Sequence, residues 1–431
     1  MPNSTSRREL LALSAQLAGA GALGACTSPA RTAEPERAER LEDLFDDLSD
    51  QRALHAPIGP EERRARRLRL GRLLERHGCD AYFCEGGPTM SYLTGFSWGK
   101  SERAFGLVVL ADGTHFWICP AFEAEKAKLA LARPDSAGGA LATWEEHEYA
   151  WAPLASQLNA RRVSRIAIDP ATRCFIPEEL RAAFGAERVT MGRSVLVDLR
   201  GVKDEHELRL LRAASELTQR AIASVARHVR VGMTGDDVSA IMALAHQKLG
   251  MTNPWCLALV GAAAAYPHGD NHTVELQPGD FLLVDTGASY HGYQSDTTRT
   301  WCVEGQPSET QQRAWFAVRE AQRAAFETIR PGVRCSAVDA SARAVLEQRG
   351  FGAGYRALTH RLGHGIGVEG HEDPYFDGGS QVELAPGMTL SNEPGVYVLG
   401  EYGVRLEDIV QCTAEGADHF GQWQAHWSSP A

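Results

Sequence analysis

Acidic residues gather at two separate places in this chain of 431 residues. Asp285 and Asp296 stand eleven positions apart, and Glu393 and Glu407 stand fourteen apart, each pair among apolar residues typical of β-strands. Singly, Asp285 could cap a turn and Glu407 could pair with Arg405. Together, four neighbouring buried carboxylates would repel one another unless cations lay between them. The pattern therefore predicts a metal site.

Three histidines, His360, His364 and His371, lie among glycines in the stretch HRLGHGIGVEGHEDP. Their spacing is not that of the helical H-E-x-x-H motif of zinc proteases. One imidazole joined to the four carboxylates would suit two divalent ions about 3.5–4 Å apart, as in other two-metal hydrolases. Mn, Co, Fe and Zn all accept such a ligand set, so the residues alone do not choose the metal.

The composition is that of a folded globular protein, with 44% hydrophobic and 23% charged residues. A formal net charge of -11 argues against a broad nucleic-acid-binding surface, and we expect no nucleic-acid partner. The body of the chain has no run of eighteen apolar residues, so we expect no internal membrane span.

The first 26 residues have the layout of an export signal. Arg7 and Arg8 precede a short apolar run and resemble a twin-arginine signal, and LGAC resembles a lipobox in which Cys26 would be lipidated. We expect a protein of the bacterial cell envelope, in the periplasm, held to a membrane only by a lipid anchor. A cytoplasmic protein with an alanine-rich leader is the alternative. Residues 27–59 are predicted as a tether, with a short amphipathic helix near residues 41–48.

The remaining chain divides into two predicted domains. Residues 60–198 alternate strand and helix patterns, which indicates a mixed α/β domain. In residues 199–431, two helices broken at Gly232 are followed about a hundred residues later by a similar unit, VRVGMTGDDVSAIM against IRPGVRCSAVDASA. One such repeat predicts a duplicated fold with pseudo-two-fold symmetry. Each unit leads into a predicted two-stranded hairpin that carries one carboxylate pair, with turns at residues 290–292 and 399–403.

The order D-x10-D, G-H-G-I-G, N-E-P-G-x-Y and R-x-E-D resembles that of the metallopeptidases with the creatinase, or pita-bread, fold. That family includes prolidases, Xaa-Pro aminopeptidases and methionine aminopeptidases. DAYF and MSYLTGF resemble its creatinase-type N-terminal domain, which methionine aminopeptidases lack. The resemblance implies an α/β (α+β) protein with a pita-bread catalytic domain behind a creatinase-like mixed α/β domain, and it favours the proline-directed branch.

By this resemblance Asp285 would bind one metal ion, Asp296 and Glu407 would bridge two ions, and His364 and Glu393 would bind the other. The ions would be two per chain, with Mn²⁺ as first choice and Co²⁺, Zn²⁺ or Fe²⁺ as alternatives. A bridging water would become hydroxide and attack the peptide carbonyl. Glu393 would carry its proton to the leaving nitrogen.

The resemblance also implies residues that contact the substrate. His268 would line the substrate site, His360 the proline side, and His371 would stabilise the oxyanion, so that His268, His371 and Glu393 are the expected catalytic residues. Arg405 would orient Glu407 or Asp296, and Tyr397 would offer a hydroxyl to the pocket. Packing within a loop is the alternative for His268 and Arg405.

The expected function is therefore metal-dependent hydrolysis of Xaa-Pro bonds in dipeptides or short peptide N-termini. The sequence leaves open whether the protein is a dipeptidase or an aminopeptidase, and whether it forms a homodimer. Trp255 and the alanine run after it differ from the polar or tyrosine residues of many prolidases, so the fine specificity also stays open. Hydrolysis of a non-peptide amide is an alternative, and a non-catalytic peptide-binding module is disfavoured by the intact ligand set.

Overall fold

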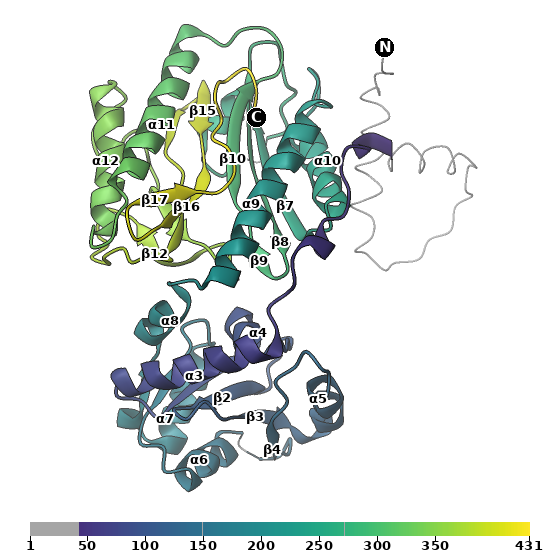
Figure 1. Cartoon of the computed structure of the whole chain (residues 1–431), viewed down its shortest axis with the longest axis vertical. Helices are drawn as coiled ribbons and strands as arrows, with labels where there is room; N and C mark the ends of the chain where they lie inside the picture. Colours follow the sequence, from purple (N-terminus) through teal and green to yellow (C-terminus); the bar gives the residue numbers. More distant parts are fainter. Residues whose placement is uncertain (1–42, 149, 271) are drawn as a thin grey trace, which may run out of the picture. The chain divides into compact units, whose positions relative to one another are not determined.

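The computed structural model describes residues 43–148, 150–270 and 272–431 (Figure 1). These residues form two compact units, one of residues 57–202 and one of residues 203–431 with the described residues before 57. The predicted export signal, Cys26 and the first part of the predicted tether lie outside the described residues. Among the helices of the described ranges, none combines the length and apolar character needed to cross a membrane.

The unit of residues 57–202 is built on a mixed six-stranded sheet in the order β4-β3-β2-β1-β5-β6 (Figure 1). Its strands are β1 Ala81–Glu85, β2 Gly106–Leu110, β3 His115–Pro120, β4 Ala140–Trp144, β5 Ile166–Ile168 and β6 Val189–Met191. Its helices are α3 Pro60–Arg76, α4 Pro88–Thr94, α5 Ala124–Leu131, α6 Trp151–Ala160, α7 Phe175–Phe184 and α8 Arg193–Arg200, with short turns η4 Ala121–Glu123 and η5 Ala186–Arg188. The buried faces of α6 and α7 share one apolar core with the central strands.

The unit of residues 203–431 contains three sheets. The first has the order β10-β8-β7 with β9 paired to β8, the second has the order β12-β11-β13-β16-β17, and β14 pairs with β15. The strands are β7 Thr252–Val260, β8 Phe281–Tyr290, β9 Tyr293–Gln294, β10 Thr297–Cys302, β11 Gly363–Gly365, β12 Glu372–Phe376, β13 Thr389–Asn392, β14 Gly395–Val398, β15 Tyr402–Arg405, β16 Asp408–Cys412 and β17 Ala417–His419. The helices are α9 Glu205–Ala226, α10 Gly235–Lys248, α11 Glu309–Thr328 and α12 Cys335–Gln348, with the short turn η6 Gly261–Ala265.

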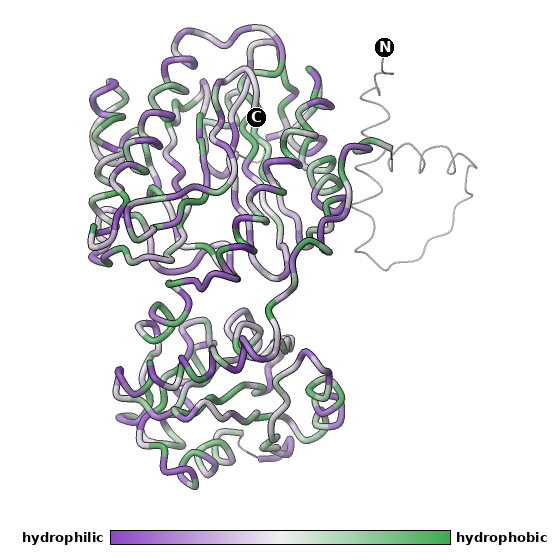
Figure 2. Tube along the Cα trace, in the orientation of Figure 1, coloured by the Kyte–Doolittle hydropathy of each residue, from purple (hydrophilic) through white to green (hydrophobic). Residues whose placement is uncertain are grey.

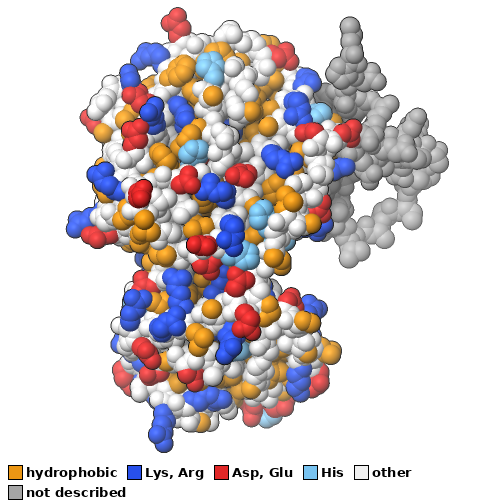
Figure 3. Space-filling model, viewed as in Figure 1, with side chains coloured by type: hydrophobic (Ala, Val, Ile, Leu, Met, Phe, Trp, Pro, Cys, Tyr) orange, Lys and Arg blue, Asp and Glu red, His pale blue; other side chains and the backbone are white. Residues whose placement is uncertain are grey.

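Polar and apolar residues alternate along these helices (Figure 2), as expected for helices that bury one face. Helix α9 begins at the N-cap Asp204, whose carboxylate accepts a hydrogen bond from the Glu207 amide at 2.9 Å. Thr234 caps α10 in the same way through the Asp237 amide. On the face shown in Figure 3, acidic and basic side chains are interspersed.

The predicted repeat is visible as the same turn in both halves of this unit. Gly232 and Gly332 each have a positive φ, 86° and 80°, which favours glycine. The Gly232 amide donates to Leu276 O at 2.8 Å, and the Gly332 amide donates to Leu384 O at 2.9 Å. Each turn therefore joins a long helix to a shorter one. Each turn is also hydrogen-bonded through its backbone to the segment that leads to a predicted carboxylate ligand, Asp285 or Glu393.

The two predicted hairpins differ in outcome. Residues 281–302 form the expected antiparallel strands around a turn at His291 and Gly292. The second segment forms four strands instead of two, because β13 pairs with β16 in one sheet while β14 pairs with β15 in another. The break falls at Pro394, which has no amide to donate to a strand partner.

Residues 44–56, within the segment predicted as a tether, pack on the second unit. Phe45 is fully buried and makes an edge contact with the His228 ring. The Gln51 amide donates to Leu249 O at 3.1 Å, and the Tyr290 hydroxyl donates to Gln51 O at 2.7 Å. The segment contains the short turns η2 Asp43–Phe45 and η3 Arg52–Leu54 and no α-helix within its described part.

Candidate metal centre

Asp285 and Asp296 project from the same face of one sheet. Antiparallel pairing of β8 with β10 places Asp285 opposite Thr298, and Asp296, two residues before Thr298, points to the same side. The strands approach so closely here that a side chain at Gly287 would put its Cβ 1.9 Å from Ser295 O. The close pairing holds the two carboxylates at a fixed separation.

Glu393 and Glu407 lie where the second sheet ends. Asn392 and Asp408 form the last register pair of β13 and β16, and the two glutamates are the next residues outward. The Glu407 amide donates to Thr298 O at 3.0 Å, which joins the second ligand segment to the first. Four carboxylates from distant parts of the sequence thus meet in one place.

His364 on β11 supplies the imidazole. Its Nδ1 lies 3.1 Å from Gly365 O, so Nδ1 carries the proton and donates it, and Nε2 keeps a lone pair. Nε2 lies 3.4 Å from Glu393 Oε1 and 3.5 Å from Asp296 Oδ2. His364 therefore presents a neutral ligand nitrogen to the carboxylates.

The structure brings all five predicted metal ligands together. Ligand atoms within 4.8 Å of one another form three groups: Asp285, Asp296 and Glu407; His364, Glu393 and Glu407; and Asp296, His364 and His371. Asp296, His364 and Glu407 each occur in two groups, so the three groups overlap and form one continuous cluster of candidate ligands.

The pKa values of three carboxyl groups in this cluster are raised. Burial raises the pKa of Asp296 well above its usual range, and the charges of Glu407 and Asp285 raise it further. Burial and the charges of Glu393 and Asp285 raise the pKa of Glu407 in the same direction. The pKa of Glu393 rises to about 8, mainly through burial. Asp285 Oδ1 and Asp296 Oδ1 are buried without a hydrogen-bond donor in the described part of the chain, so the donor set fits divalent cations.

Arg405 contacts a different ligand from the one expected. Its Nη2 donates to Asp285 Oδ2 at 2.7 Å, whereas we expected it to orient Glu407 or Asp296. It reaches Glu407 only through Thr298, whose hydroxyl accepts from Arg405 Nε at 3.2 Å and donates to Glu407 Oε2 at 2.7 Å. The strand register explains this contact. Thr298 pairs with Asp285 across the sheet, and its hydroxyl bonds to both Arg405 and Glu407.

His360 and Tyr397 continue the hydrogen-bond chain from Arg405. Arg405 Nη1 donates to the Tyr397 oxygen at 3.0 Å. His360 Nδ1 lies 2.7 Å from Arg361 O and donates to it, so His360 Nε2 accepts from the Tyr397 hydroxyl at 2.7 Å. Burial lowers the pKa of His360 to about 3, so this ring is neutral. These residues form one polar wall beside the carboxylates.

His371 and His268 lie on the open side of the cluster, and both are exposed. The His371 ring stacks on the His364 ring with centroids 3.7 Å apart, so His371 is a further candidate ligand in addition to its predicted role at the oxyanion. His268 lines the same cavity as the carboxylates. Burial also lowers the pKa of His371, and the nearby Arg361 charge adds to the shift.

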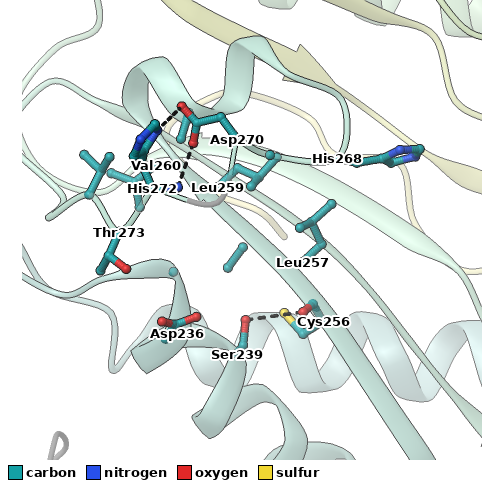
Figure 4. Close-up of a pocket in the computed structure, with 15 residues that line it drawn as sticks. Asp236, Ser239, Cys256, Leu257, Leu259, Val260, His268, Asp270, His272 and Thr273 are labelled. Atoms are coloured by element: carbon teal, nitrogen blue, oxygen red, sulfur yellow. Dashed lines mark hydrogen bonds and ion pairs between the residues drawn. The ribbon is translucent and has the colours of Figure 1, made fainter.

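These side chains border a cavity of about 580 Å³. Its apolar wall is made by Trp255 and Leu257 of β7 with Pro267. A smaller hollow of about 320 Å³ lies beside it and shares Leu257 and His268 as lining residues (Figure 4). In Figure 4, Asp236 and Ser239 lie at its α10 side and the Asp270–His272 pair lies opposite.

Thr298 and Trp255 show what sequence reasoning missed. Nothing in the sequence marks Thr298, and only the structure shows that its hydroxyl donates to Glu407. Trp255 was singled out for its type, but its place in the cavity wall depends on a bulge, since β7 shifts register between Thr252 and Trp255 and Asn253 has φ 50°. All eight cysteines of the described ranges are free thiols.

Comparison with known proteins identifies the family and agrees with the fold. Residues 209–414 match metallopeptidase family M24, and residues 66–202 match the creatinase/prolidase N-terminal domain. The chain is 32% identical over 354 residues to the putative dipeptidase YkvY of Bacillus subtilis, covering 81% of this chain and 95% of the relative. It is 37% identical over 336 residues to the probable dipeptidase PepE of Mycobacterium tuberculosis, covering 77% and 87%.

Solved structures give the same result. Dipeptidase PepE from Mycobacterium ulcerans matches with a TM-score of 0.79 and 30% identity, covering 86% of this chain and 98% of that one. A prolidase from Thermococcus sibiricus matches with a TM-score of 0.73 and 26% identity, covering 83% and 96%. The predicted fold class is confirmed, and family membership implies divalent metal binding. The chain belongs to metallopeptidase family M24, as a prolidase-like member with a creatinase-type N-terminal domain and a pita-bread catalytic domain.

Proposed function

We propose that this peptidase hydrolyses the bond before proline in dipeptides or short peptide N-termini, using two divalent ions, with Mn²⁺ as first choice. The observation that carries the proposal is the meeting of four carboxylates and the His364 imidazole, in overlapping ligand groups, inside one cavity. Asp285 would complete one ion's ligands, and His364 with Glu393 would complete the other's. Ions bound there supply Lewis acidity and lower the pKa of a coordinated water.

The two oxygens of Glu393 have different surroundings. Oε1 accepts from the Ser391 hydroxyl at 3.0 Å and lies 3.4 Å from His364 Nε2, so it is the ligand oxygen. Oε2 faces the cavity wall, 4.0 Å from His360 Nδ1. We assign proton transfer to Oε2. The leaving nitrogen of an Xaa-Pro bond is the proline ring nitrogen, which has no hydrogen in the amide and must gain a proton before it leaves. We therefore place Glu393 Oε2 and the polar wall of His360 and Tyr397 on the proline side of the substrate.

A peptide panel tests this function. The protein is stripped with chelator, reloaded with Mn²⁺ or Co²⁺, and assayed on Ala-Pro, Ala-Ala and Ala-Pro-Ala. We expect activity only after reloading, with Ala-Pro cleaved faster than Ala-Ala. Equal rates on both dipeptides would refute the preference for proline, and activity without metal would refute the metal centre. Relative rates on Ala-Pro and Ala-Pro-Ala separate a dipeptidase from an aminopeptidase.

We also propose export by the twin-arginine route and a lipid anchor at Cys26, supported by the residue pattern of the first 26 positions. Cell fractionation tests the anchor. Wild-type protein is expected with membranes, and Cys26→Ala is expected in the soluble fraction. Identical fractionation of the two would refute lipidation at this residue.

A further inference from the structure

An ion pair is buried between the two strands that begin directly after Asp296 and Glu407. Arg299 on β10 and Asp408 on β16 are 2% and 1% exposed, and Arg299 Nη2 lies 2.7 Å from Asp408 Oδ1. Burying such a pair costs much of what its attraction returns, so replacing it by apolar residues is often neutral for stability. Overall stability is therefore a poor explanation for it.

Arg299 binds the backbone of a metal-ligand candidate. Its Nη1 donates to Glu407 O at 2.7 Å and to Thr298 O at 3.1 Å. Its Nη2 donates to Gln422 O at 2.8 Å as well as to Asp408. Because Arg299 follows Asp296 by three residues, one side chain ties the strand of Asp296 to the backbone of Glu407.

Asp408 connects this ion pair to β13, the strand that ends directly before Glu393. It accepts from Gln219 Nε2 of α9 at 3.1 Å and from Gln322 Nε2 of α11 at 3.0 Å. The same Gln322 nitrogen donates to Asn392 O at 3.2 Å, and Asn392 Nδ2 donates back to Gln322 O at 2.8 Å. Asn392 directly precedes Glu393, so the contacts end at the next ligand candidate.

We propose that Arg299, Asp408 and Gln322 are positioning residues that hold the backbones beside Asp296, Glu393 and Glu407 at the separation two ions need. None of the three is among the residues that line the cavity. The role rests on the metal centre proposed above. A clamp on three strands matters here because small displacements of a ligand weaken metal binding even when every ligand is present.

Equilibrium metal binding tests this role without relying on activity. In the full chain, Arg299→Met with Asp408→Leu removes both charges and keeps an apolar filling. The double variant leaves buried hydrogen-bond partners of both side chains unpaired, so we expect the metal-free protein to unfold at a lower temperature than wild type. In the folded variant, calorimetric titration is expected to show Mn²⁺ affinity lower by about 10–100-fold. Mn²⁺ affinity within twofold of wild type would overturn the proposal, whatever the unfolding temperature.

Arg299→Lys keeps the test decisive if the double variant does not fold. Lysine preserves the charge but cannot donate to Glu407 O, Asp408 and Gln422 O together, so Mn²⁺ affinity is expected to fall at least fivefold. Unchanged affinity in this variant would also overturn the role.

A partly buried pair in the other unit gives a control. Glu85, 3% exposed, and Arg173, 30% exposed, form an ion pair in the unit that carries none of the ligand candidates, and Glu85→Leu with Arg173→Met should leave Mn²⁺ affinity unchanged. An equal loss in this control would make the effect non-specific and overturn the assignment. Failure of wild-type protein to bind Mn²⁺ would instead refute the metal centre itself.

Discussion

At the scale of single residues, the ligand candidates differ in what neutralises them. Asp285 receives a charged hydrogen bond from Arg405, which is 3% exposed, whereas Asp296 has a buried oxygen with no donor within the described residues. Removing the Asp285 charge therefore has two costs. A metal ligand is lost, and a buried guanidinium loses its carboxylate partner.

We predict that Asp285→Asn lowers kcat/KM on the best substrate by about 100-fold or more and reduces the metal content of the purified protein. Steady-state kinetics with elemental analysis measure both. Asp236→Asn is the matched control, because this exposed carboxylate lines only the neighbouring hollow and its loss should change neither quantity. Full activity in Asp285→Asn would show that the ligand assignment is wrong.

Trp255 makes a second residue-scale prediction. The indole is 40% exposed, lines the metal cavity and packs over Gly287, so it offers apolar surface to a substrate side chain. We expect Trp255→Ala to raise KM for Leu-Pro about tenfold with little change in kcat, and Trp255→Phe to lie between. Gly-Pro is the internal control, since it has no side chain to contact the indole. Equal changes for both dipeptides would contradict this role.

At the scale of elements, strand pairing decides which side chains meet. The alternating pattern of residues 281–302 was sufficient to predict the first hairpin and its carboxylates. The second segment has the same pattern, yet its strands divide between two sheets at Pro394, which periodicity does not reveal. Arg299 was not singled out, and Asp408, the last residue of R-x-E-D, was given no role, because their partners come from other strands and from helices 80 or more residues away. Motif order predicted the five ligand candidates, whereas the residues that support them depend on register.

Gly287 tests the pairing of β8 with β10. A methyl group there would lie 1.9 Å from the Ser295 carbonyl oxygen, so Gly287→Ala must push the strands apart. We expect about 3 kcal/mol less unfolding free energy and weaker metal binding, measured by urea unfolding and Mn²⁺ titration. Gly416→Ala is the control, since nothing lies within 4 Å of its added Cβ. If Gly287→Ala matches Gly416→Ala in both measurements, the close approach is not required.

At the scale of the whole molecule, the clustered carboxylates link metal binding to folding stability. The folded-state pKa of Glu393 is raised to about 8, and those of Asp296 and Glu407 are also raised. Between pH 7 and 8 the folded, metal-free chain thus holds carboxyl protons that the unfolded chain has already released. Its stability falls as pH rises through this window. Buried histidines such as His246, with a pKa lowered to about 4, have the opposite effect near pH 6.5, where the unfolded imidazole is still half protonated, and this effect fades above pH 7.

We therefore predict that the metal-free protein loses about 2 kcal/mol of unfolding free energy from pH 7 to pH 8. The metal-loaded protein should lose much less, because cations replace the protons. Urea unfolding at several pH values, with chelator or with Mn²⁺, measures the difference. A metal-free protein that gains stability over this range would contradict the assigned carboxylate cluster. Metal-free Glu393→Gln should show a smaller slope than wild type.

The order of the ligand candidates along the chain is also the order in which they are synthesised. The five candidates emerge from the ribosome in the order 285, 296, 364, 393 and 407. Glu407 is held by hydrogen bonds to Thr298 and Arg299, which precede it in the chain by more than a hundred residues. No partial chain that stops before Glu407 contains the complete ligand set. The full site therefore becomes available only late in synthesis, and the metal it takes depends on the ions present where this part of the chain folds.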